Sequence, residues 1–559
     1  MIRNRLRHIQ RYRDIVFALS RYGFGYIAME LGLHDLLSLP KRIFTKDQSK
    51  YQTHSMGERV RLILEDLGPT FIKLGQFAST RSDLFPDDII KELEKLQDDV
   101  PPFSKHEAKK IIEHELGRSI EELFHTFNEN PLAAASIGQV HQGILFTGED
   151  VAIKIQRPEI EEKVHTDLEI LSNLANLAEQ RVEWASRYQV KDIIEEFSKS
   201  LKNELDYTVE GYNAEKIAKQ FIDDPNIYVP KVYWDFSTKR VLTMEFIDGT
   251  KLNEEAKLAS AGVNNEQIAE RIVESLFYQI FIEGFFHGDP HPGNIMVLPD
   301  EKIVYLDFGS VGRVTADMKK HLSSFIIALM RQNTDGIIKA INRMGVIPED
   351  TDMKKLRADV DLLREKYYDV PLSRVSLDES VNDLFTVTYN HHIHLPSDLT
   401  LLGKTLLTIE GIVERLDPEL SIVKMAEPFG SQLLKQRYHP KKIAENILND
   451  LMEYSEIVTE LPETINELKS VINKGKVRLE INIPSLDRSL KKLDQISNRL
   501  SFSIVLLSFS IIMTGLIIGS AVVRQSTLLW DIPVIEIGFV VAILMFLAIL
   551  YGIFKSGRF

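Results

Sequence analysis

The spacing of hydrophobic and polar residues changes from helical to strand-like and back to helical along the chain. Residues 57–81 place apolar side chains at roughly helical spacing, with a Gly-Pro break at 68–69, and residues 1–110 share this character. Residues 139–156 predict two short strands joined by a turn at 147–150. Residues 227–249 are again rich in strand formers, and from about residue 252 helices dominate, except around 294–309. We therefore expect an α+β protein with a small β-containing lobe followed by a larger helical lobe.

Two apolar segments stand near the end of the sequence. Residues 501–523 contain no charged residue and would extend about 34 Å as a helix, which is enough to cross the hydrocarbon layer of a membrane. A second apolar run covers about 533–554, and basic residues precede the first run and follow the second. The pattern predicts a transmembrane hairpin with both ends in the cytoplasm. Two buried core helices are the alternative interpretation.

These patterns divide the chain into five parts. We expect a helical extension at 1–110, a small lobe at 111–250, a large lobe at 251–437, a polar helical stalk at 438–500 and two membrane helices at 501–559. A Val-Pro-Pro-Phe segment at 100–103 is typical of a boundary and lies near the end of the extension.

Composition narrows the classes of function. The chain has 559 residues and a net charge of −14, which argues against a general nucleic-acid binder. It contains no cysteine, so disulfides, thiolate zinc sites and cysteine nucleophiles are excluded. The first 25 residues, by contrast, carry six arginines and a single acid, Asp14. This segment is either an amphipathic helix that meets an anionic membrane or a basic surface helix of a folded domain.

A polar segment with candidate chemistry, His-Gly-Asp-Pro-His-Pro-Gly-Asn at 287–294, lies between two apolar runs. A kinase catalytic loop contains His-x-Asp followed by Asn five positions after the Asp, and His287, Asp289 and Asn294 keep that register. We expect Asp289 to accept or orient the proton of an attacking hydroxyl or water, and Asn294 to hold a metal ion. We expect His291 to support the turn rather than to transfer protons.

Two further segments supply the remaining parts of a phosphoryl-transfer site. Asp307 begins an Asp-Phe-Gly triplet after an apolar strand, where a carboxylate would bind Mg²⁺ that bridges the nucleotide phosphates. Lys154 ends a Val-Ala-Ile-Lys segment, where its ammonium would neutralise phosphate charge and needs a carboxylate partner from a helix. Glu204 and Glu210 are the candidate partners, with Glu204 ranked first and Asp206 as an additional polar or metal ligand. The order of these motifs predicts ATP and Mg²⁺ as cofactors.

The nucleotide also needs an adenine-binding segment and a loop over its phosphates. Residues 240–249 contain an apolar strand in which the backbone of Glu245 and Ile247 would bind adenine and Met244 would flank it; a plain inter-lobe strand is the alternative. No Gly-x-Gly-x-x-Gly segment precedes the Val-Ala-Ile-Lys strand. Its place is taken by four small residues, Ala133, Ala134, Ala135 and Ser136. Because alanine tolerates positive φ less well than glycine, this loop should be stiffer.

Two other patterns have competing interpretations. Gly403-Lys404-Thr405 looks like the end of a Walker A loop, but Asp398 stands where that motif needs glycine, so we interpret it as the start of a core helix. Residues 390–394 cluster three histidines, which suit a metal site, although a solvated loop between helices is the interpretation that we favour.

Together these segments resemble the UbiB family of atypical kinases, also called the ADCK group. The resemblance rests on Lys73-Leu74-Gly75-Gln76, which matches the family's KxGQ signature, and on Glu204-Leu205-Asp206, which matches its ExD signature. It rests also on the alanine-rich loop and on the His-x-Asp-x-His-Pro-Gly-Asn form of the catalytic loop. The resemblance covers roughly residues 55–420.

What the resemblance implies is an atypical protein-kinase-like fold whose N-terminal extension covers the place where a protein kinase receives its peptide. Lys73 and Gln76 would gate the site and point toward Glu204 and Asp206. The family is associated with ATP hydrolysis and with isoprenoid-quinone biosynthesis on membranes. We therefore expect a Mg²⁺-dependent ATPase anchored in the cell membrane, with its kinase-like domain in the cytoplasm, that supports the biosynthesis or handling of quinones or other prenyl lipids.

Three alternatives stay open. The chain could be a small-molecule or lipid phosphotransferase, an ATP-gated lipid-binding scaffold without turnover, or a protein kinase acting in trans, which requires that Lys73 does not cover the site. The partners that we expect are the lipid bilayer, quinone or prenyl-lipid precursors, their biosynthetic enzymes and a second copy of the chain, but no nucleic acid.

Overall fold

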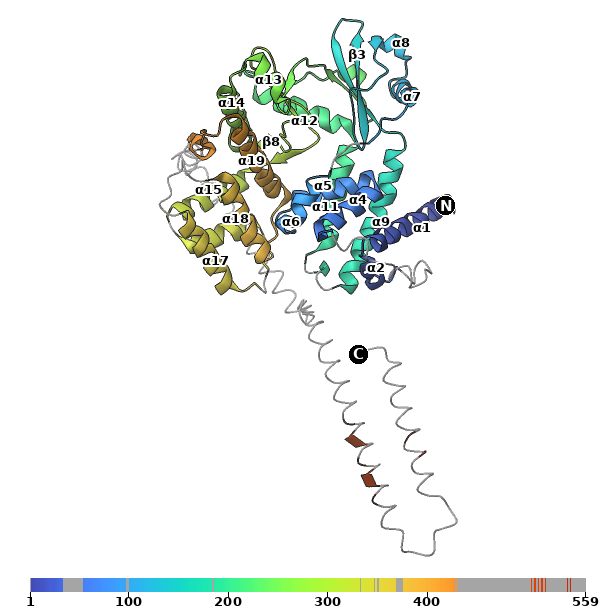
Figure 1. Cartoon of the computed structure of the whole chain (residues 1–559), viewed down its shortest axis with the longest axis vertical. Helices are drawn as coiled ribbons and strands as arrows, with labels where there is room; N and C mark the ends of the chain where they lie inside the picture. Colours follow the sequence, from blue (N-terminus) through green and yellow to red (C-terminus); the bar gives the residue numbers. More distant parts are fainter. Residues whose placement is uncertain are drawn as a thin grey trace, which may run out of the picture. The chain divides into compact units, whose positions relative to one another are not determined.

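The computed structural model describes residues 2–426 apart from gaps, the longest of which are 34–53, 97–99 and 368–375, together with scattered residues further on. All described elements lie in the first of two compact units, residues 1–446. In chain order this unit contains a set of helices, a small lobe built on a β-sheet and a larger helical lobe (Figure 1). The predicted α+β class is therefore confirmed.

The N-terminal extension is helical, and its elements are α1 (Ile2–Arg21), α2 (Gly25–Glu30), α4 (Met56–Leu67), α5 (Pro69–Ser79) and α6 (Asp87–Leu93). A capping box formed by Ser55 and Glu58 starts α4. Gly68, with φ of 87°, ends α4, and Pro69 takes the first position of α5. The predicted Gly-Pro break thus separates two helices that pack against each other.

The basic N-terminal helix α1 packs against the folded domain. Its buried face contains Ile15 and Val16. Arg11 forms a 2.6 Å ion pair with Asp167, whose side chain is only 1% exposed, and Arg21 pairs with Asp66 at the same distance. Because these cations are matched by acids of other helices, the contacts support the interpretation of a basic surface helix.

The small lobe is an antiparallel sheet in the order β1-β3-β4-β6, with β2 added to β3. Its elements are α7 (Lys105–Leu116), α8 (Ile120–Leu123), β1 (Phe124–Phe127), β2 (Ala133–Ala134), β3 (Gly138–Leu145), β4 (Asp150–Gln156) and β6 (Val241–Glu245). Val151, Ile153 and Ile155 on β4 are fully buried, and successive strand residues face opposite sides, so Lys154 points to the other face of the sheet. The predicted hairpin of β3 and β4 is confirmed.

A helical layer connects β4 to the rest of the chain. It consists of α9 (Ile160–Arg181), α11 (Val190–Glu204) and α12 (Tyr207–Gln220), followed by β5 (Ile227–Tyr228) and a short 3₁₀ turn (Trp234–Phe236). Asp206 separates α11 from α12 because its side chain accepts a hydrogen bond from the Thr208 amide and caps α12.

The large lobe is mainly helical and carries two small sheets. Its helices are α13 (Glu255–Ala261), α14 (Asn265–Phe277), a π-helical turn (Tyr278–Glu283), α15 (Ala316–Met330), α16 (Thr334–Met344), α17 (Met353–Lys366), α18 (Leu377–Asn390) and α19 (Ser397–Leu416). Its strands are β7 (Thr250–Lys251), β8 (Phe285–His287), β9 (Ile295–Val297), β10 (Ile303–Tyr305) and β11 (Val311–Arg313). They form the sheets β5-β10-β9-β7 and β11-β8.

A buried ion network joins the extension to two other segments. Arg81, 4% exposed, follows α5 and binds Asp83 through two hydrogen bonds of 2.8 Å. The same guanidinium donates to Glu196 of α11 at 2.8 Å and to the carbonyl of Leu395, just before α19, at 3.4 Å. The extension is therefore fixed both to α11 and to the large lobe.

No helix among the described residues is both long and apolar enough to cross a membrane. The predicted stalk at 438–500 lies outside the described residues, and so does the predicted hairpin at 501–559 apart from scattered positions. Both therefore stay predictions.

Candidate active site

His287, at the end of β8, shapes the loop that follows it. The π-helical turn before β8 places the buried Gln279, whose Oε1 accepts a 2.9 Å hydrogen bond from the His287 amide. His287 Nε2 lies 2.8 Å from the carbonyl of Leu306, and its Nδ1 accepts from the Asp289 amide at 3.2 Å. These bonds require a proton on Nε2 and none on Nδ1. Burial lowers the pKa of His287, which favours the same neutral form.

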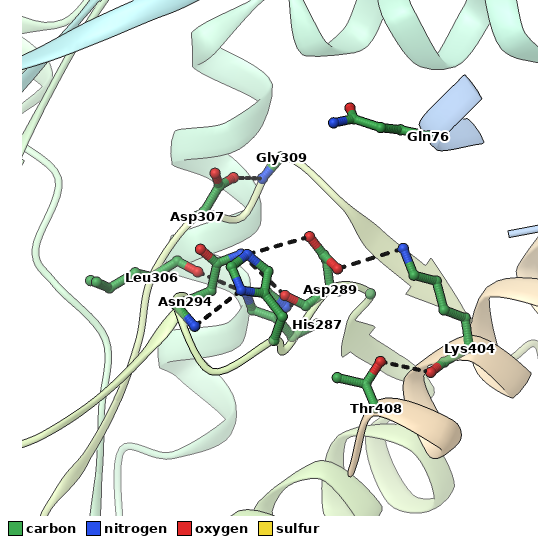
Figure 2. A network of polar contacts seen from close by, with 12 residues as sticks. Gln76, His287, Asp289, Asn294, Leu306, Asp307, Gly309, Lys404 and Thr408 are labelled. Carbon is green, nitrogen blue, oxygen red and sulfur yellow. Dashed lines mark hydrogen bonds and ion pairs between the residues drawn. The ribbon is translucent and has the colours of Figure 1, made fainter. Parts of the chain in front are cut away.

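Asp289 and Asn294 lie at the two ends of one tight loop. The Asn294 amide group donates from Nδ2 to the Asp289 carbonyl at 3.1 Å, and this leaves its Oδ1 as a candidate metal ligand. His291 accepts from the Gly293 amide through Nδ1 at 3.0 Å and so supports the turn. Figure 2 shows Asp289 between Asn294 on one side and Lys404 on the other.

Asp307 follows β10 in a backbone conformation that is rare for residues other than glycine, with φ of 57°. Its Oδ1 accepts from the Gly309 amide at 3.2 Å, and Phe308 behind it is fully buried. Lys154 Nζ lies 4.0 Å from the same oxygen. This ammonium, together with the Gly309 amide, outweighs burial and lowers the pKa of Asp307 to about 2. Asp307 is therefore ionised at neutral pH and suited to hold a cation.

Lys154 pairs with Glu210, not with Glu204. Its Nζ donates to the two carboxylate oxygens of Glu210 at 2.9 and 2.7 Å, and the Glu210 side chain is 8% exposed. The sequence-based ranking of Glu204 ahead of Glu210 is wrong because Glu204 ends α11, whereas Glu210 lies inside α12. Burial by itself would lower the pKa of Lys154, but Asp307 and Glu210 more than offset it, so the pKa is raised well above the usual value.

The KxGQ residues of α5 face this site. Lys73 Nζ lies 2.5 Å from Glu204 Oε1, so the carboxylate expected to serve Lys154 serves the lysine of the extension instead. Gln76 Nε2 donates to the Leu96 carbonyl at 3.2 Å. Asp206 uses Oδ1 for the Thr208 amide, at 3.1 Å, which makes it a helix cap.

The alanine-rich segment forms an ordered turn between β2 and β3. Ala133 and Ala134 pair with Val140 and Gln139, and the Ala135 amide donates to the Gly138 carbonyl at 2.8 Å. The Ser136 hydroxyl is fully buried and has no hydrogen-bond partner among the described residues. A buried hydroxyl without a partner costs free energy.

The predicted adenine-binding segment consists of β6 and the residues just after it. The amides of Glu245 and Phe246 donate to the carbonyls of Lys231 and Asp150, at 2.8 and 2.9 Å. Met244 is half-buried at the end of this strand and pairs with Ala152 of β4. Ile247 lies just beyond the strand, and its amide makes no backbone hydrogen bond within the described part of the chain, so it is the candidate donor for an adenine edge.

The donor set fits a magnesium ion. Asp307 and Asn294 offer a carboxylate oxygen and an amide oxygen, and Mg²⁺ in nucleotide sites takes one or two such ligands and completes its shell with phosphates and water. Across the described ranges no group of three or more His, Cys, Asp or Glu side chains could hold a metal without a nucleotide. The histidines instead contact residues far away in the sequence, since His391 binds Asp359 at 2.8 Å and His392 binds Tyr188 at 3.0 Å. The expectation of a solvated loop is wrong for His391, which is only 5% exposed.

Lys404 belongs to this site, although the sequence pattern assigned it only to a core helix. Gly403-Lys404-Thr405 lies in a helix as expected, although well inside α19 rather than at its start, and Lys404 Nζ reaches to 3.7 Å from Asp289 Oδ1. The signal in the sequence is the absence of lysine and arginine from the catalytic loop. A lysine or arginine that serves this loop must therefore come from another segment.

Comparisons with known proteins agree with this geometry. Family models described as "ABC1 atypical kinase-like domain", "UbiB helical domain" and "ABC1/UbiB kinase-like C-terminal domain" match residues 95–341, 360–421 and 484–555. The chain is 35% identical to "Probable protein kinase UbiB" of Marinobacter nauticus over 412 residues, which cover 73% of this chain and 75% of that protein. It is 37% identical to "Protein ACTIVITY OF BC1 COMPLEX KINASE 7, chloroplastic" of Arabidopsis thaliana, over 70% of this chain and 57% of that one.

A solved structure, "The complex structure of Rv3197-erythromycin from Mycobacterium tuberculosis", is 26% identical, with a TM-score of 0.44 over 64% of this chain and 95% of that one.

Fold and site together define an atypical kinase-like protein. The chain belongs to the ABC1/UbiB family.

Proposed function

We propose that the chain is a Mg²⁺-dependent ATPase that works at a membrane in the biosynthesis or handling of isoprenoid quinones or other prenyl lipids. The observation that carries this proposal is the Lys73–Glu204 pair of 2.5 Å, because it links the extension to the end of α11, next to the helix that carries Glu210. In this proposal the extension covers the side from which a peptide would reach Asp289. Water or a small acceptor fits this arrangement better than a protein chain does.

Each charged group has a distinct task in this proposal. Lys154, held by Glu210, neutralises the phosphates, and the buried pair fixes the ammonium in place. Asp289 orients the attacking water, while His287 holds the loop through its two hydrogen bonds. Asp307 and Asn294 would hold Mg²⁺, which supplies positive charge along the phosphates.

An ATPase assay tests the proposal. We expect phosphate release from ATP by the full chain, stimulated by liposomes and by quinone-like phenols. Asp289→Asn should lower turnover by about 100-fold or more while nucleotide binding persists, because the change removes the group that orients water. If turnover is equal in the wild type and the Asp289→Asn variant, the proposal fails.

A second measurement separates the alternatives. Transfer of phosphate to an added phenol or alcohol rather than to water would identify a phosphotransferase, and tight binding without any release of phosphate would identify a scaffold. Deletion of 501–559 should release the protein from liposomes and leave basal turnover intact, since these apolar runs are the proposed anchor. Unchanged co-sedimentation after the deletion would overturn the proposed anchor.

A further inference from the structure

Lys404 lies at the reacting end of the site described above. Its Nζ is 3.7 Å from Asp289 Oδ1, and it reaches there from α19, on the side of Asp289 away from Asn294 (Figure 2). The Lys154 ammonium lies beside Asp307 instead, at 4.0 Å. The two lysines therefore flank two different carboxylates of one site.

The position of Lys404 is fixed by its neighbours on α19. The buried hydroxyl of Thr405 donates to the carbonyl of Gly288 in the catalytic loop at 3.2 Å. A Cβ on Gly288 would lie 2.8 Å from Leu401 Cδ2, so a larger residue there would force the Leu401 side chain of α19 to shift. Helix and catalytic loop thus form one packed unit, and the base of the Lys404 side chain is held beside Asp289.

The ammonium of Lys404 is not committed to a structural bond. Its 3.7 Å separation from Asp289 exceeds hydrogen-bond distance, whereas Lys154 and Glu210 meet at 2.7 Å. Over the described residues no hydrogen bond of its Nζ is found, and Glu94, at the end of α6, is the second carboxylate near enough to attract it. An ammonium with open donors next to the group that orients the nucleophile can bind another anion.

The catalytic loop also contains no lysine or arginine. Between Asp289 and Asn294 it contains Pro290, His291, Pro292 and Gly293, and the His291 ring is used to hold the Gly293 amide. Transfer of a phosphoryl group develops negative charge on the transferred oxygens, and fixed cations at that point lower the barrier. A site with Lys154 and the metal ligands alone would lack a cationic side chain beside Asp289.

We propose that Lys404 is a catalytic residue that binds the terminal phosphoryl group of ATP, an inference that rests on the proposed ATPase function. A bond forms between the water oxygen and the terminal phosphorus, and the bond to the bridging oxygen breaks to release ADP. The water proton passes to Asp289, and Lys404 keeps its own proton throughout. Its positive charge stays beside the transferred oxygens.

Binding of two nucleotides tests the proposal without requiring turnover. Calorimetry with Mg²⁺ compares ADP with AMP-PNP, which carries a terminal phosphoryl group but is not hydrolysed. Lys404→Met, which keeps most of the side-chain length, should weaken AMP-PNP binding at least about tenfold and leave ADP binding unchanged, and Lys404→Arg should retain part of the preference. Lys354→Met, an exposed lysine on α17, is the matched control and should change neither affinity.

The possible outcomes separate this inference from the proposed function. Equal affinities in Lys404→Met and the wild type, or an equal loss for ADP and AMP-PNP, would overturn the phosphate contact. If the wild type binds both nucleotides but never hydrolyses ATP, the proposed function fails while the binding comparison still decides the role of Lys404. Where turnover is present, kcat of Lys404→Met should fall about 100-fold, as for the loss of one charge-stabilising donor. The Lys354→Met protein should hydrolyse ATP at the wild-type rate.

Discussion

Replacement of Glu210 by glutamine removes one charge from a buried pair and leaves the shape of the side chain almost unchanged. In the wild type both Glu210 oxygens accept from Lys154, and the Glu210 side chain is 8% exposed. Asp307, 4.0 Å from the ammonium, is then the nearest remaining carboxylate. Glu204→Gln makes the same chemical change in a more exposed pair, with 28% of the Glu204 side chain accessible, and therefore serves as the matched control.

The burial of the two ion pairs ranks the losses of folding free energy that we expect for the two variants. Loss of one partner from a buried ion pair destabilises a protein by about 3–5 kcal/mol. Glutamine can still accept one hydrogen bond and Asp307 still neutralises Lys154, so we expect the lower end, about 3 kcal/mol, for Glu210→Gln. For the more exposed Lys73–Glu204 pair we expect about 1 kcal/mol or less. The variants should therefore differ by about 2 kcal/mol.

Thermal unfolding followed by fluorescence, with a fluorescent ATP analogue to measure affinity, checks this ranking. A loss of 3 kcal/mol should lower the midpoint by about 3–6 °C in a unit of this size, and nucleotide affinity should fall with it because Lys154 is displaced toward Asp307. If Glu204→Gln lowers the midpoint as much as Glu210→Gln does, the assignment of Lys154 to Glu210 is wrong. Unchanged nucleotide affinity in Glu210→Gln would show that the pair does not position Lys154.

Three further predictions concern the metal ligand, the alanine loop and the buried histidine. Asp307→Asn should abolish Mg²⁺-dependent nucleotide binding, which calorimetry with and without Mg²⁺ measures; wild-type affinity would refute the ligand role. Ala134→Gly should loosen the turn between β2 and β3 and change the ratio of ATP to ADP affinity by about threefold or more, and an unchanged ratio would contradict the stiffness argument. Stability should fall below about pH 6.5, because the folded state keeps His287 neutral with a lowered pKa while the unfolded chain takes up the proton. The midpoint of His287→Gln should decline less between about pH 7 and 5.5 than that of the wild type, and an equal decline would assign the effect to other groups.

Local patterns predicted the parts of the site that depend on one segment. The alternation in β4 places Lys154 opposite Val151, Ile153 and Ile155, and the catalytic loop keeps the spacing of its functional side chains because a tight turn closes between Asp289 and Asn294. These features follow from strand periodicity and turn chemistry, which a sequence carries directly.

Pairings between segments could not be predicted in the same way. Glu204 and Glu210 are close in sequence, but the cap at Asp206 ends one helix and starts the next, so each carboxylate faces a different lysine. Lys404 reaches Asp289 only because α19 packs on the catalytic loop through Gly288 and Thr405. Such contacts depend on how helices pack, which helical periodicity does not specify.

The Arg81 network has a consequence for how long a product stays bound. One guanidinium, 4% exposed, joins the segment after α5 to α11 and to the chain just before α19. Opening of the two lobes would separate this poorly hydrated cation either from Glu196 or from the Leu395 carbonyl, and the lost contact would cost free energy. ADP should therefore dissociate slowly even where its affinity is modest. A change that loosens the extension should shorten the time for which ADP stays bound.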